Sequence, residues 1–140
     1  MSTGTKVVYE QTAVSKTILV VEDYDDTREM VRRFLEVKGY RVVEGVNGEQ
    51  GLIVAMTERP DLILMDLKMP VIDGFTATRM IRELDDLGDV PVVAITADGS
   101  RGRDFYNNVD ELGIGRIEYL SKPLDFDKLE QLLDSLLREA

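Results

Sequence analysis

Short apolar runs alternate with amphipathic segments along most of the chain, and this alternation constrains the fold more than any other feature. Each run has the length of a buried strand, and the segments between them mostly show helical spacing of apolar residues. The runs span residues 17–21, 41–46, 62–66, 91–97 and 116–121. Strands joined by helices predict a parallel sheet covered on both faces. Because crossovers are right-handed, a five-stranded doubly wound α/β sheet is the economical arrangement.

The segments between the strands predict four clear helices. They are expected over residues 25–39, 48–58, 73–84 and 126–139. Asp26 stands three residues before Glu29 as a possible capping box, and Gly39 suits the end of that helix. Asp73 and Gly74 are read as a turn and helix start.

The stretch between the fourth and fifth strands departs from this pattern. Residues 97–115 contain four glycines and two adjacent asparagines, which are poor helix formers. We expect a short helix around residues 103–112 that is displaced or mobile.

Length and composition predict one globular domain. The chain has 140 residues, of which 44% are apolar and 31% charged. Residues 1–16 are weakly patterned and are expected to form a mobile tail before a domain over 17–140. No apolar run reaches the length of a membrane span and no signal peptide is visible, so a cytoplasmic location is expected. The net charge of −10 argues against nucleic-acid binding and against docking on anionic membrane.

Cysteine and histidine are both missing from the chain, and their absence limits its chemistry. It has no cysteine, so disulfides and thiolate metal sites are excluded. It has no histidine, so it can offer neither an imidazole base nor a phosphohistidine. Carboxylate clusters remain as metal ligands, and they favour hard cations such as Mg²⁺.

Polar residues stand where the predicted strands end. Glu22 and Asp23 follow the first strand, Asp66 ends the third, Thr96 lies near the end of the fourth and Lys122 follows the fifth. Carboxyl ends of parallel strands form the ligand crevice of such sheets. Two carboxylates about 4 Å apart repel by roughly 4 kcal/mol at an effective dielectric of 20, so a divalent cation is the simple explanation for three. An ammonium and a hydroxyl beside them suit a phosphoryl group.

Four sequence segments resemble, in order and spacing, the receiver domain of bacterial two-component response regulators. They are "ILVVEDYDDTREMVRRFLEVKGY", "PDLILMDLKMPVIDGFTATRMIR", "PVVAITA" and "YLSKPLDFDKLEQLL". The resemblance covers roughly residues 17–138 and implies a flavodoxin-like (βα)5 fold with strand order 2-1-3-4-5. It implies a signalling domain that accepts a phosphoryl group, rather than an enzyme.

The resemblance also implies a role for each residue at the strand ends. Asp66 would be the phospho-acceptor, forming an acyl phosphate. Mg²⁺ would be held by Glu22, Asp23, Asp66 and the backbone carbonyl of Lys68.

A second set of residues would sense the phosphoryl group. Thr96 and Lys122 would bind its oxygens, and Tyr119 would move inward as Thr96 is drawn to the phosphate. Lys122 and Pro123 would be joined by a cis peptide. Thr96 could equally be a β-former, and Tyr119 a half-buried strand aromatic.

The partners implied are a sensor histidine kinase or histidine phosphotransfer protein as donor and a protein target downstream. A stand-alone response regulator is expected, since only three residues follow Leu137. A phosphorylation-dependent dimer is possible.

Three other readings stay open at the level of sequence. An aspartyl phosphatase or phosphotransferase would place a second aspartate two residues after its nucleophile, where this chain has Lys68. A flavodoxin-type module would need a phosphate loop after the first strand, where "EDYDD" would repel phosphate. A degenerate receiver would act as a constitutive interaction domain, but every expected site residue is present.

Overall fold

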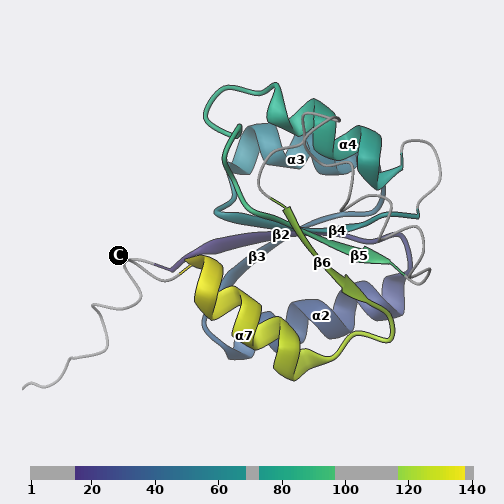
Figure 1. Ribbon diagram of the computed structural model, residues 1–140, viewed down its shortest axis with the longest axis vertical. Coiled ribbons are helices and arrows are strands. Elements are labelled where there is room, and N and C mark those ends of the chain that lie inside the picture. Colours follow the sequence, from purple (N-terminus) through teal and green to yellow (C-terminus); the bar gives the residue numbers. More distant parts are fainter. Residues whose placement is uncertain (1–14, 69–72, 97–116, 138–140) are drawn as a thin grey trace, which may run out of the picture.

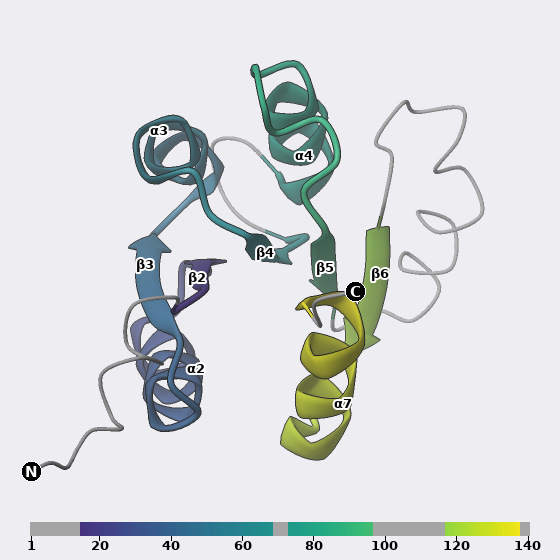
Figure 2. The same ribbon diagram turned by 90° about the vertical axis from the view of Figure 1, so that its left-hand side faces the viewer.

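A computed structural model describes residues 15–68, 73–96 and 117–137 of the chain. Its centre is a five-stranded parallel sheet with strand order β3-β2-β4-β5-β6 (Figures 1 and 2). The strands are β2 (Thr17–Val21), β3 (Arg41–Gly45), β4 (Leu62–Asp66), β5 (Val92–Thr96) and β6 (Ile117–Ser121). Counted along the chain, this is the order 2-1-3-4-5, so the predicted doubly wound fold is confirmed.

In the described part of the chain, two pairs of helices cover the two faces of the sheet. The helices are α2 (Asp25–Val37), α3 (Gly48–Glu58), α4 (Gly74–Arg82) and α7 (Phe126–Leu137). Helices α3 and α4 lie on one face, and α2 and α7 lie on the other (Figure 1). None of the described helices has the length and hydropathy needed to cross a membrane.

Alternation along each strand divides the core into two apolar clusters. Ile18 and Val20 of β2 point to the face covered by α2 and α7, while Leu19 and Val21 point to the face covered by α3 and α4. All four side chains are buried. A central strand buried on both faces must be apolar throughout, so the first polar residue is placed where the strand ends.

The first residues beyond the strands are held almost as firmly as the strands themselves. The Glu22 amide donates to the Gly45 carbonyl at 3.0 Å, and the Leu67 amide to Ile95 at 3.0 Å. The Lys122 amide likewise donates to the Thr96 carbonyl at 2.8 Å. The sheet therefore fixes the backbone of the residues that leave its carboxyl edge.

The predicted capping box of the first helix is wrong. The N-cap of α2 is Tyr24, and it makes no side-chain cap hydrogen bond. Asp26 lies inside the helix, and Asp25 pairs with Arg28 at 2.7 Å instead of capping. Neither aspartate therefore supplies the cap that the pattern assigned to Asp26.

Other helix signals are confirmed. The Asp73 side chain accepts a hydrogen bond from the Thr76 amide at 2.9 Å and caps α4. Gly39 follows the end of α2 with a φ of 98°, a conformation that favours glycine. The expectations for the tail over residues 1–14 and for residues 97–115 lie outside the described residues.

Gly74 allows α4 to approach the end of β4. A Cβ added at this position would lie 2.6 Å from the Asp66 carbonyl oxygen and 2.8 Å from the Leu67 Cα. Both neighbours are backbone atoms, so neither can move aside as a flexible side chain would. The close contact ties the start of α4 to the backbone of Asp66.

We expect Gly74→Ala to lower the free energy of unfolding by about 1–3 kcal/mol, because the backbone must shift to admit the methyl group. Urea denaturation followed by circular dichroism measures this. Gly88→Ala is the matched control, since its Cβ would meet only the Arg82 carbonyl oxygen at 3.7 Å. Equal stabilities of the two variants would contradict the steric account.

Candidate functional site

Three carboxylates meet at the carboxyl edge of the two central strands. Glu22 and Asp23 follow β2, and Asp66 is the last residue of β4. One ligand atom from each lies within 4.8 Å of the others. Glu22 and Asp66 are buried, whereas Asp23 is exposed. The sequence prediction that these three side chains converge is therefore confirmed.

The ammonium of Lys122 reaches into this cluster from the end of β6. Its Nζ lies 3.4 Å from Asp66 Oδ2 and 3.6 Å from Glu22 Oε1. When all groups are ionised, three negative charges face one positive charge, which leaves a net charge of −2. A hard divalent cation would balance this charge. Carboxylate oxygens are the ligands that such cations prefer.

Backbone amides hold the other oxygens of the two buried carboxylates. Asp66 Oδ1 accepts a hydrogen bond from the Lys68 amide at 3.1 Å. Glu22 Oε2 accepts one from the Tyr24 amide at 3.1 Å. Each carboxylate is thus oriented by its own loop, with its second oxygen turned toward Lys122.

Burial raises the pKa of Glu22 to about 7, and the negative charge of Asp66 adds to the effect. The Tyr24 amide and Lys122 act in the opposite direction but do not offset it. A proton can therefore occupy Glu22 near neutral pH when no cation is bound, as expected for crowded carboxylates.

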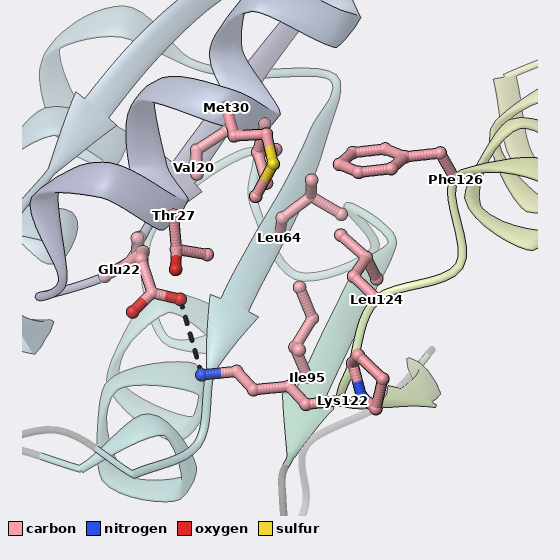
Figure 3. Close-up of a pocket in the computed structure, with 12 residues that line it drawn as sticks. Val20, Glu22, Thr27, Met30, Leu64, Ile95, Lys122, Leu124 and Phe126 are labelled. Carbon is pink, nitrogen blue, oxygen red and sulfur yellow. Dashed lines mark ion pairs between the residues drawn. The ribbon is translucent and has the colours of Figure 1, made fainter.

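A mostly apolar pocket lies next to Glu22. It has a volume of about 320 Å³ and lies between α2 and the segment that enters α7. Figure 3 shows Glu22 and Lys122 together at one side of it, with Val20, Leu64 and Leu124 among its apolar walls. Its walls are mostly apolar and so offer few groups that could solvate the ionised form, which agrees with the raised pKa of Glu22.

The other residues named from the sequence lie around the same edge. Thr96 is buried at the end of β5, and Tyr119 is half-buried on β6 against the core cluster beneath α3 and α4. Lys122 and Pro123 are joined by a cis peptide, as the resemblance implied. Lys68 is exposed two residues after Asp66.

Sequence reasoning missed Arg28 of α2. Its Nη1 donates to the Glu22 carbonyl oxygen at 2.9 Å, so it contacts the backbone of the acidic loop. A signal was present in the sequence, because Arg28 occupies the same helical stripe as Val31 and Leu35, which are buried. A charged residue on a buried stripe indicates a polar partner.

The raised pKa of Glu22 predicts how pH affects the metal-free protein. The folded state keeps this proton up to about pH 7, whereas the unfolded state releases it near 4.5. Between these values the folded state binds more protons, so its stability falls as pH rises. Glu22→Gln removes this contribution.

Urea denaturation in a chelating buffer checks the prediction. The free energy of unfolding of wild type minus that of Glu22→Gln should fall steadily as pH rises from 4.5 to 7. Glu49→Gln, an exposed position on α3, is the control for the same chemical change. If the difference in free energy of unfolding between wild type and Glu22→Gln is constant or rises with pH, Glu22 does not have a raised pKa.

Comparisons with known proteins agree with this geometry. The family model for the response regulator receiver domain matches residues 18–134. The polar-differentiation response regulator DivK of Brucella anthropi is 32% identical over 126 residues, which cover 89% of this chain and 98% of DivK. The hybrid signal transduction protein dokA of Dictyostelium discoideum is 35% identical over 136 residues. These cover 96% of this chain but 8% of dokA, so the chain spans a small part of that relative.

Solved structures show the same likeness. The receiver domain of the sensor histidine kinase PA1611 from Pseudomonas aeruginosa has a TM-score of 0.78 and 33% identity, covering 90% of this chain and 100% of that one. That structure has a magnesium ion coordinated in its active site cleft. The chemotaxis response regulator CheY4 of Vibrio cholerae has a TM-score of 0.78 and 26% identity, covering 88% of this chain and 99% of CheY4. The chain therefore belongs to the response regulator receiver domains, which accept a phosphoryl group in two-component signalling.

Proposed function

We propose that Asp66 is the phospho-acceptor of this receiver domain. One observation carries the proposal: the Asp66 carboxylate is buried at the edge of the sheet with one oxygen held by the Lys68 amide and the other facing Lys122. A carboxylate fixed in this way keeps a constant orientation toward an incoming phosphorus atom, which favours attack.

In the proposed reaction, an oxygen of Asp66 attacks the phosphorus of a donor phosphohistidine. The new P–O bond forms as the P–N bond breaks, and the bonding electrons return to the donor imidazole. The donor histidine must come from another protein, because this chain contains none. A sensor histidine kinase or histidine phosphotransfer protein fits this role.

The residues of the acidic cluster fit a Mg²⁺ ion. We assign its protein ligands to Glu22, Asp23, Asp66 and the Lys68 backbone carbonyl, supported by the convergence of the three carboxylates. When bound, Mg²⁺ neutralises charge on the phosphoryl oxygens. The cluster without a cation bears unbalanced negative charge that would repel a phosphoryl group.

Lys122 and Thr96 are proposed to bind the phosphoryl oxygens once the bond has formed. Lys122 Nζ already lies 3.4 Å from Asp66 Oδ2, so it needs little movement to contact a group attached there. Thr96 ends the neighbouring strand and is paired in register with Ser121, next to Lys122. Thr96 and Tyr119 would then act together as the switch.

The output proposed for this switch is a change in protein–protein contacts. A downstream protein target, and a phosphorylation-dependent dimer, would read the position of Tyr119. The domain would catalyse its own phosphorylation and dephosphorylation without acting as an enzyme on other substrates. A cytoplasmic location is part of the proposal, since the donor and the target are signalling proteins.

Intact mass after incubation with acetyl phosphate tests the acceptor. We expect one phosphoryl group on the wild-type protein in the presence of Mg²⁺, and none after chelation or in Asp66→Asn. The amide cannot act as the nucleophile but leaves the fold largely intact, because the side chain keeps its size.

The matched control is Asp86→Asn, an exposed position whose φ of 70° suits asparagine. This variant should gain the phosphoryl group as wild type does. A phosphoryl group that persists in Asp66→Asn would place the acceptor elsewhere.

The proposed switch predicts that Tyr119 responds to a phosphoryl mimic only when residue 96 carries a hydroxyl. Fluorotyrosine NMR on addition of Mg²⁺ and beryllofluoride should show a shifted Tyr119 signal in wild type and Thr96→Ser, but not in Thr96→Val. The Tyr119→Phe variant identifies the signal. An equal shift in a Thr96→Val protein that demonstrably binds beryllofluoride would refute the coupling.

A further inference from the structure

Arg28 joins three parts of the chain beside the acidic cluster. Its Nη1 donates to the Glu22 carbonyl oxygen at 2.9 Å, its Nε to Glu44 Oε1 at 2.9 Å and its Nη2 to Asp25 Oδ1 at 2.7 Å. The side chain is only 14% exposed, although it is an arginine near the start of a helix. All three sides of the guanidinium fork are therefore used, and none of its contacts is to the ligand oxygens of the cluster.

The contact between Arg28 and the Glu22 carbonyl oxygen restrains the backbone just beyond the last residue that the sheet holds. The Glu22 amide is held by the Gly45 carbonyl at 3.0 Å, the last such bond from β3 to this segment. Arg28 then fixes the following peptide group through its carbonyl oxygen. Both peptide groups that flank the Glu22 side chain are thus anchored, which limits how Glu22 and Asp23 can turn.

The anchor at the other end of Arg28 is itself rigid. Glu44 belongs to β3, where it pairs in register with Val20 of β2. Its second oxygen forms an ion pair with Arg32 Nε at 3.1 Å, so both of its oxygens contact arginines of α2. Arg28 therefore connects the acidic loop to the sheet through a carboxylate that has a fixed position.

We propose that Arg28 is a positioning residue that holds the Glu22–Tyr24 loop in the geometry that binds Mg²⁺. The inference rests on the proposed metal site and adds a residue that touches neither the metal nor the phosphoryl group. Contacts behind metal ligands commonly tune affinity because they orient the ligands.

A simpler role, as a counter-charge to the surrounding carboxylates, makes the opposite prediction. Removing a positive charge near a cation site strengthens cation binding by electrostatics alone. Loss of a positional restraint weakens it. The sign of the change in Mg²⁺ affinity therefore separates the two roles.

The experiment is calorimetric titration of the full chain with Mg²⁺ for wild type, Arg28→Gln, Arg28→Lys and Arg33→Gln. We expect about tenfold weaker binding in both Arg28 variants, the size typical of a lost contact behind a metal ligand. Lysine keeps the charge but cannot replace the planar fork that serves three acceptors. Arg33 is the control because it is on the same helix, is 71% exposed and forms an ion pair with Glu29 on the helix surface, away from the acidic loop.

Two further readouts distinguish positioning from general damage to the fold. In phosphorylation by acetyl phosphate, the Mg²⁺ concentration for half-maximal rate should rise in the Arg28 variants while the rate at saturating Mg²⁺ is largely kept. In metal-free protein, the amides of Asp23 and Tyr24 should exchange with solvent faster in Arg28→Gln than in Arg33→Gln, with core amides unchanged.

Unchanged or tighter Mg²⁺ binding in Arg28→Gln would overturn the proposal in favour of a counter-charge. Wild-type affinity in Arg28→Lys would overturn it by showing that the fork is not needed. Wild-type protein that takes up no Mg²⁺ would overturn the metal site and the positioning role with it. Amide exchange would then show separately whether Arg28 still restrains the loop.

Discussion

The site depends on one constraint: a parallel sheet brings the carboxyl ends of neighbouring strands to a common edge. Strands β2 and β4 are paired in register from Ile18 and Leu62 to Val21 and Met65. The residues that follow, Glu22 and Asp66, must therefore emerge side by side. Because both strands are buried on both faces, their carboxylates are only slightly exposed as they leave the sheet. The pairing of β2 with β4 thus determines both the centre of the sheet and the repulsion between Glu22 and Asp66.

The repulsion between these carboxylates is kept in the folded protein rather than relieved. Lys122 compensates only in part, at 3.4 Å from Asp66 and 3.6 Å from Glu22. Burial, together with the remaining repulsion from Asp66, raises the pKa of Glu22 to about 7. A more complete set of ion pairs would make the metal-free domain more stable, but it would leave less unbalanced charge to attract a cation. The arrangement favours function over local stability, as strained sites generally do.

Much of this architecture could be predicted from the sequence. Apolar runs located the strands to within one or two residues, because a buried strand has a strong and local signal. The meeting of the Glu22 and Asp66 carboxylates in one crevice was predicted by the rule that ligands bind at the carboxyl ends of parallel strands. The capping box at Asp26 failed because the N-cap of α2 is Tyr24, so Asp26 already lies inside the first turn of the helix. Arg28 in turn was missed because two of its partners, Glu22 in the loop after β2 and Glu44 in β3, lie outside its own helix.

The residues proposed to bind the phosphoryl group and the proposed switch residue, Tyr119, lie in different structural settings. Glu22 and Lys122 are tied to the sheet by backbone hydrogen bonds that extend the ladders of β3 and β5. The ring of Tyr119 lies half-buried against the core cluster beneath α3 and α4. Backbone ladders resist small displacements, whereas an aromatic ring at the margin of a core can change position without breaking the sheet. In the proposed switch, a phosphoryl group bound beside the residues that the ladders hold would displace the Tyr119 ring, and neighbouring strands of one sheet supply both.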